Sequence, residues 1–269
     1  MIIVGELINA SRKSVKAAIE SQDSLMIQNL ASSQTASDVN YIDVNAGVFV
    51  EKEKKYLNWC IDNIIEVTDL PVCIDSSNGA AIESALAYFQ KKSNAIPMIN
   101  SISLEKKKMD QLLPLISGTD LKIVALCMSD EGMPKTVEER LSIAEQLVNV
   151  LVQNNVKIEN IYIDPLVQAL STDSSLGKTF LVTIEEIIRR YEGIHTMCGL
   201  SNISYGLPNR KDLNRIFMSM AIAKGLDGAI INPLDKQMMA TITSANALVG
   251  RDKFCKNYLK AYRAGKLDK

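Results

Sequence analysis

The sequence has little of what several common types of site require. His195 is its only histidine, which removes most histidine-based metal sites and the Ser-His and Cys-His catalytic pairs. The five cysteines are scattered singly, without the close pairs of zinc sites and without a disulfide framework. Because reduced, scattered thiols are typical of the cytosol, we predict a cytoplasmic protein with no metal of its own.

Long apolar runs and an excess of one charge are also missing. No run approaches the roughly 18 apolar residues that span a bilayer, and the opening segment MIIVGELIN has no basic leader. The 30 Lys and Arg residues nearly cancel the 31 Asp and Glu residues, so no bulk attraction to nucleic acid or to an anionic membrane is expected. We therefore expect neither among the partners.

Short, β-branched apolar runs alternate with amphipathic stretches of helical length. The strands are expected at residues 2–8, 41–44, 72–74, 96–99, 122–128, 161–163, 196–200 and 229–231. The clearest helices are expected at 51–67, 80–91, 137–153 and 212–224. Local helix signals support this interpretation. Two patterns match capping boxes, Thr136 with Glu139 and Thr183 with Glu186, and Gly225 is placed to end a helix.

The alternation of strands and helices predicts an α/β fold with a parallel sheet. Strands that are apolar throughout are typical of a sheet covered on both faces by helices. The strand starts are about 25 to 40 residues apart, which suits βα units, and eight such units can close into a (β/α)8 TIM barrel. A doubly wound open sheet is the alternative, but no GxGxxG follows the first strand. We predict one barrel domain over residues 1–269.

Polar side chains gather where the expected strands end, and in a barrel these positions build the active site. They include Glu6, Asn9, Asp43, Asn45, Asp75, Asn100, Asp164, Ser201 and Asn202, with Arg210 as the nearest cation after the seventh strand. Carboxylates and carboxamides from almost every strand favour a ligand rich in hydrogen bonds over a phosphate.

A pterin fits this set of side chains. Its adjacent N–H groups can pair in a two-pronged way with a carboxylate, and its carbonyl and ring nitrogens suit Asn. Asp75, Asn100 and Asp164 are the residue types required. For single residues a structural role competes: helix capping for Asp75, and loop solvation for Asp43 and Asp164.

Several segments at the strand ends resemble a known family. They are GELIN (5–9), YIDVNAG (41–47), CIDSSN (73–78), MINSIS (98–103), YIDPLV (162–167) and GLSNISYGLPNR (199–210). The sequence is similar to the methyltetrahydrofolate:corrinoid/iron-sulfur protein methyltransferase family, and more distantly to the pterin domain of cobalamin-dependent methionine synthase. Leu7 departs from the family's usual GERIN, which has Arg at this position.

The resemblance implies a TIM barrel of the pterin-binding, dihydropteroate synthase-like superfamily that works as a homodimer. It implies a methyltransferase of one-carbon metabolism, which moves a methyl group between nitrogen 5 of tetrahydrofolate and the cobalt of a corrinoid (cobalamin) on a partner protein. Asp75, Asn100 and Asp164 would hold the pterin, and the catalytic Asn202 would face nitrogen 5. Further expected substrate-binding residues are Arg210, Glu6, Asn9, Asp43, Asn45, Gly199 and Ser201.

Two alternatives remain open at this point, as does the direction of transfer. A dihydropteroate synthase-like enzyme would need basic residues and a longer loop after the first strand, where this chain has only NASRKS. A non-catalytic pterin-binding subunit would be expected to lack the Asn that stands at 202.

Overall fold

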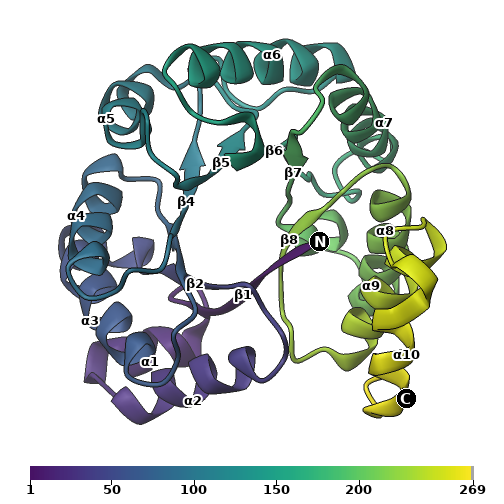
Figure 1. The fold of residues 1–269 in the computed structure, drawn as a ribbon. Helices are drawn as coiled ribbons and strands as arrows, with labels where there is room; N and C mark the ends of the chain where they lie inside the picture. Colours follow the sequence, from purple (N-terminus) through teal and green to yellow (C-terminus); the bar gives the residue numbers. More distant parts are fainter. Residues whose placement is uncertain (268–269) are drawn as a thin grey trace.

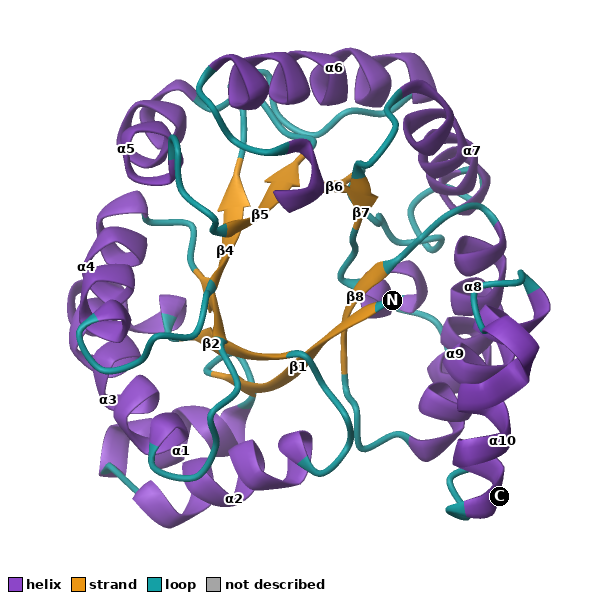
Figure 2. Cartoon of the chain, viewed as in Figure 1, coloured by secondary structure: helices purple, strands orange, loops and turns teal. Residues whose placement is uncertain are grey.

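The computed structural model describes residues 1–267 and shows a ring of helices around eight parallel strands (Figures 1 and 2). The strands follow one another around the sheet in the order β7-β6-β5-β4-β3-β2-β1-β8. Their bounds are β1 Ile2–Asn9, β2 Tyr41–Asn45, β3 Val72–Asp75, β4 Met98–Ile102, β5 Lys122–Leu126, β6 Ile161–Asp164, β7 His195–Thr196 and β8 Gly228–Ile231. The predicted (β/α)8 barrel is confirmed.

Helices follow every strand, and the first connection holds two of them. The α-helices are α1 Lys13–Ser21, α2 Ser24–Thr35, α3 Glu53–Ile65, α4 Gly79–Gln90, α5 Lys106–Ile116, α6 Val137–Gln153, α7 Leu176–Arg190, α8 Arg210–Ala223, α9 Lys236–Leu248 and α10 Lys256–Arg263. Short 3-10 helices cover Gly47–Lys52, Ile158–Asn160, Leu200–Ser204 and Lys253–Cys255. None of the helices in residues 1–267 is long and apolar enough to cross a membrane.

The barrel closes between the end of the β7 segment and β8. Ile230 donates its N–H to the carbonyl oxygen of Cys198 at 2.9 Å, and Gly199 forms a parallel bridge with Ile230. A Cβ atom on Gly228 would lie 3.0 Å from the carbonyl oxygen of Thr196, so only glycine lets the two segments approach this closely.

The barrel interior explains why the polar strand ends converge. A buried cluster inside the barrel consists of Val4, Tyr41, Cys73, Met98, Val124, Tyr162 and Met197. Side chains two residues apart on a strand point to the same side. Glu6, Asp43, Asp75, Asn100 and Asp164 each stand two residues after a member of this cluster. The cluster therefore forms a floor, and the polar side chains lie above it.

The helix signals were partly right. Thr136 and Glu139 form the capping box that starts α6, and Gly225 follows α8 with a φ of +117°. The capping box predicted at Thr183 is wrong, because α7 starts at Leu176 and the buried Thr183 hydroxyl donates to the Thr179 carbonyl oxygen within that helix. A threonine inside a helix can hydrogen-bond the carbonyl oxygen four residues earlier, and a glutamate three residues after it then gives the same sequence pattern as a capping box.

Three strand predictions need correction at their ends. β5 ends at Leu126 rather than at residue 128. β4 starts at Met98 rather than at residue 96, since Pro97 has no N–H to donate to a neighbouring strand. The seventh strand is only His195–Thr196, and residues 200–204 form a 3-10 helix instead of extending it. After this early end the GLSN segment enters the 3-10 helix, with Gly199 bridged to Ile230.

We predict that Gly5→Ala destabilises the fold. A Cβ atom at residue 5 would lie 2.3 Å from Oε1 of the buried Gln34, which accepts the Leu7 N–H at 3.0 Å. Overpacking of this kind costs about 1 to 3 kcal/mol, measurable by urea unfolding. In a Gln34→Ala background the same change should cost much less; an equal cost in both backgrounds would contradict the clash.

Candidate functional site

One register row carries much of the predicted site. Asn9 pairs with Asn45, Asn45 with Asp75, and Asp75 with Asn100 across strands β1 to β4. Parallel pairing at equal height places these four side chains along one edge of the barrel mouth. Three of them form hydrogen bonds within the protein: the Asn9 Oδ1 accepts the Ser11 N–H, and the Asn45 Nδ2 donates to the Asp75 Oδ2 at 2.8 Å.

Asp75 is oriented by its neighbours and is not a helix cap. The cap of α4 is Asn78, whose Oδ1 accepts the Ala80 N–H. Burial raises the pKa of Asp75, while the hydrogen bond from Asn45 and the charge of Lys108 lower it. The Asp75 carboxylate thus keeps one edge for a ligand while Asn45 fixes the other.

Two further carboxylates lie deeper. Asp43 is 1% exposed, and burial followed by the charge of Asp75 raises its pKa well above the usual range. Burial also raises the pKa of Glu6, against the opposing charges of Arg12 and Arg210; Arg12 lies 3.7 Å from the Glu6 carboxylate. Burial and the charge of Asp75 both favour the neutral form of the Asp43 carboxyl over its ionised form.

Asp164 faces the mouth from β6. Its Oδ1 accepts the Leu166 N–H at 2.8 Å, and burial raises its pKa to about 7 against the opposing effects of that bond, of Arg140 and of the Gly199 N–H. At 9% exposure it is not the solvated loop residue that was the alternative. Its charge is therefore poised to change near neutral pH, which is common at binding sites.

Arg140 of α6 holds the loop that follows Asp164. Its side chain is fully buried and donates to the carbonyl oxygens of Pro165 and Leu166, both at 2.8 Å, and to the Gln168 Oε1 at 2.9 Å. Leu166 has a φ of +68°, a conformation that a branched side chain rarely adopts. The guanidinium thus stabilises a strained loop beside the site.

Replacing Arg140 with Met should therefore unfold this loop first. We expect a loss of about 3 kcal/mol in the free energy of unfolding, because one buried and two partly buried acceptors lose their donors. Urea unfolding measures the loss, and protease cleavage within 165–175 detects the freed loop. Arg140→Lys keeps the positive charge but lacks the several N–H donors of the guanidinium, so it should retain only part of the stability. Full wild-type stability in this variant would refute the role of these donors.

Asn202, Ser201 and Gly199 lie in the segment after β7. Asn202 is exposed and lines a cavity of about 500 Å³ together with Val167, Leu176 and Tyr205. Arg210 does not project freely into this cavity, because it donates to the Ser204 Oγ at 3.0 Å and to the Ser201 carbonyl oxygen at 2.7 Å. Arg210 therefore shapes the Ser201–Asn202 turn and adds positive charge opposite Glu6.

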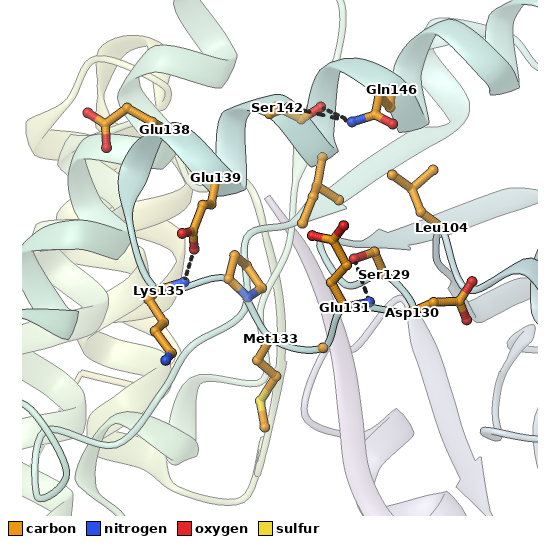
Figure 3. A pocket seen from close by; sticks show the side chains of 13 residues that line it. Leu104, Ser129, Asp130, Glu131, Met133, Lys135, Glu138, Glu139, Ser142 and Gln146 are labelled. Carbon is orange, nitrogen blue, oxygen red and sulfur yellow. Dashed lines mark hydrogen bonds between the residues drawn. The ribbon is translucent and has the colours of Figure 1, made fainter.

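A second cavity of about 740 Å³ lies between the β5–α6 loop and the first turns of α6 (Figure 3). It shares Met133 and Lys135 with the cavity beside Asn202. Asp130, Glu131 and Glu138 line it, and it contains none of the predicted site residues. We assign it no part in the site.

Two charged residues at the site were not predicted from the sequence. Lys108 of α5 is 9% exposed and Glu53 of α3 is 3% exposed. The Ser76 hydroxyl donates to the Glu53 Oε1 at 2.5 Å. Both stand inside helices, where charge usually marks a solvated face, so the sequence carries no signal that separates them from surface charges.

Comparison with known proteins shows the family of the chain. A family model described as pterin binding enzyme matches residues 5–232. Methylcorrinoid:tetrahydrofolate methyltransferase of Eubacterium limosum is 38% identical over 99% of this chain and 98% of that protein. Methionine synthase of Mycobacterium tuberculosis is 25% identical over 86% of this chain, which corresponds to 20% of that protein.

Solved structures show the same fold. The dihydropteroate synthase of Coxiella burnetii in complex with pteroic acid superimposes with a TM-score of 0.70 at 16% identity, covering 93% of this chain and 94% of that one. A dihydropteroate synthase of Xanthomonas albilineans with 4-aminobenzoic acid gives a TM-score of 0.65 at 15% identity, over 94% and 93%. At such identities the likeness concerns the fold alone.

Proposed function

The chain belongs to the pterin binding enzyme family, and from this premise we propose that it moves a methyl group between nitrogen 5 of tetrahydrofolate and the cobalt of a corrinoid on a partner protein. The observation that carries the proposal is that Asp75, Asn100 and Asp164 each stand two residues after a member of the apolar floor, while Asn202 lines a cavity together with the loop that follows Asp164. The whole-chain relative, named as a methylcorrinoid:tetrahydrofolate methyltransferase, supports it.

The three side chains supply what a pterin edge needs. The carboxylates of Asp75 and Asp164 accept from its N–H groups, and the Asn100 carboxamide both donates and accepts. Because the carboxylates are largely removed from water, each such bond is stronger than it would be at the surface. Gly199, Ser201 and Arg210 shape the turn that carries Asn202, and Asn45 orients Asp75.

Asn202 acts at nitrogen 5. In the direction suggested by the relative's name, the lone pair of this nitrogen attacks the methyl carbon on cobalt, the new N–C bond forms, and the cobalt–carbon bond breaks with its electron pair left on cobalt. The nitrogen then loses its proton to solvent. The Asn202 oxygen accepts from that N–H and aims the lone pair, while in reverse its amide donates to the departing nitrogen.

The wider proposal concerns how the protein works in the cell. Residues 1–269 act as one pterin-binding domain, as a homodimer, in the cytoplasm. The cavity beside Asn202 is open, with Met133 60% and Tyr205 68% exposed, so a bulky corrinoid has access to the nitrogen. The cobalt arrives as part of the substrate on the partner protein.

Methyl transfer followed optically tests the proposal. We expect cob(I)alamin to be methylated by methyltetrahydrofolate, and methylcobalamin to methylate tetrahydrofolate, each only with the enzyme present. Absence of both transfers together with absence of folate binding would overturn the proposal. Folate binding without either transfer would favour the non-catalytic subunit. Condensation of a pterin diphosphate with aminobenzoate would favour the dihydropteroate synthase alternative.

A further inference from the structure

We propose that Lys108 is a positioning residue that keeps Asp75 ionised and thereby ready to accept the N–H groups of the pterin. This inference rests on the proposed function, and it concerns a side chain to which the pterin motifs assign no role. Lys108 stands in the first turn of α5, while Asp75 ends β3.

The fold brings the two residues together through β4. Asp75 pairs in register with Asn100, and the next residue, Ser101, is buried. The Lys108 ammonium donates to the Ser101 Oγ at 3.4 Å. α5 follows β4 directly, so its first turn sits over the end of the strand that neighbours Asp75.

Lys108 is buried, whereas Asp75 and Glu105 are only partly buried, and its ammonium makes only that one hydrogen bond among the described residues. Among the described residues no carboxylate lies within 4.0 Å of its ammonium, so Lys108 forms no direct salt bridge with them. Burying a lone ammonium is costly unless nearby negative charge compensates it. Burial lowers the pKa of Lys108, and the opposing compensation comes from Glu105, which caps α5, and from Asp75.

The electrostatic balance at Asp75 depends on this lysine. The neighbouring carboxyls include Asp43 of β2, whose pKa is raised by burial and by the charges of Asp75 and of Glu6 of β1. Glu53 of α3 disfavours the ionisation of Asp75. Burial acts in the same direction, whereas Asn45 and Lys108 oppose it. Asn45 is neutral, which leaves Lys108 as the cation that acts on the Asp75 carboxylate.

The consequence is a division of roles at the site. A protonated Asp75 would present an O–H where the pterin presents N–H groups, and one of the two bonds of the pair would be lost. Lys108 prevents this by favouring the carboxylate through space, without contact with the ligand. Its effect must therefore depend on pH, unlike that of a residue that merely packs.

The test is the affinity for methyltetrahydrofolate as a function of pH in full-length protein, for wild type and three variants. Lys108→Met removes the charge and keeps the length of the side chain, and apolar replacements of buried charges are commonly tolerated. Lys108→Arg keeps the charge. Lys107→Met removes the same charge from an exposed position one residue away and serves as the matched control.

In Lys108→Met we expect the pH below which affinity falls to move up by about 1 to 2 units, the size typical for loss of a neighbouring opposite charge. The affinities of mutant and wild type should converge at high pH, Lys108→Arg should follow wild type, and Lys107→Met should show no shift. The titration of Asp164 is common to all four proteins, so the difference between their profiles reports on Asp75.

Two outcomes would overturn the inference: an equal loss of affinity at every pH, which is the signature of a packing role, or a profile unchanged from wild type. A ¹³C NMR titration of the Asp75 carboxyl in the ligand-free protein supplies a second measurement, and the same upward shift in Lys108→Met is expected there. If wild type binds no folate at any pH, the proposed function fails, while the NMR titration still decides the effect of Lys108.

Discussion

Asn202→Ala should lower the rate of methyl transfer by about 10²- to 10³-fold while changing the affinity for methyltetrahydrofolate only a few-fold. The amide acts on nitrogen 5 as its charge changes, so most of its effect belongs to the transition state rather than to the bound substrate. Binding rests instead on Asp75, Asn100 and Asp164. Single-turnover transfer to cob(I)alamin and a fluorescence titration with folate measure the two quantities separately.

A second carboxamide in the same loop provides the control. Asn209 has a φ of +48°, so Asn209→Gly removes the side chain without backbone strain. We expect this variant to transfer methyl groups at nearly the wild-type rate. An equal loss of rate in both variants would indicate that loop order, and not the contact with nitrogen 5, is what matters.

The residues of the strands were predictable because a simple periodicity governs them. Cys73 and Asp75 are two residues apart, and so are Met98 and Asn100. When the first residue of such a pair lies inside the barrel, the side chain two positions later points to the same side and reaches the barrel mouth. Once the strands are located, the polar residues that end them follow without knowledge of the tertiary structure. The confirmed capping box at Thr136 and the glycine at 225 are similarly local.

The supporting residues were not predictable in this way. Arg140 and Lys108 belong to helices, and their partners at 165–168 and at Asp75 lie about 25 to 33 residues away in the chain. Whether a helical cation is buried depends on how its helix is rotated against the barrel. Thr183 shows the same limit, since its pattern matches a cap and only the start of α7 at Leu176 decides otherwise.

The site therefore combines charges that the fold alone would disfavour. Burial and the charge of Asp75 both disfavour the ionisation of Asp43. Such clusters lower stability and are typical of sites whose charges serve a ligand. A pterin that donates hydrogen bonds to the carboxylates relieves this cost on binding, so ligand should raise the free energy of unfolding.

Asp164→Asn should weaken the binding of methyltetrahydrofolate about 100-fold at pH 8 and much less at pH 6. The substitution replaces an ionised carboxylate, which only accepts hydrogen bonds, with a neutral carboxamide that has one accepting and one donating group. Asp164 has a pKa of about 7 in the ligand-free protein, so it is mostly protonated at pH 6 and mostly ionised at pH 8. Accepting N–H groups favours the ionised form. Wild-type affinity should therefore rise about tenfold between pH 6 and pH 8 and level off above.

The same linkage requires that a proton be released on binding. At pH 6 we expect wild type to release about 0.9 proton from Asp164 and at pH 8 about 0.1, measured by calorimetry in buffers of different ionisation enthalpy. Asp120→Asn is the matched control, since the hydrogen bond and the charge of Lys157 keep the pKa of this exposed carboxyl below its usual range and it lines neither cavity. It should retain the wild-type release, and Asp164→Asn should lose it. Equal release in wild type and Asp164→Asn at pH 6 would show that another group, such as Asp75, is the one that titrates.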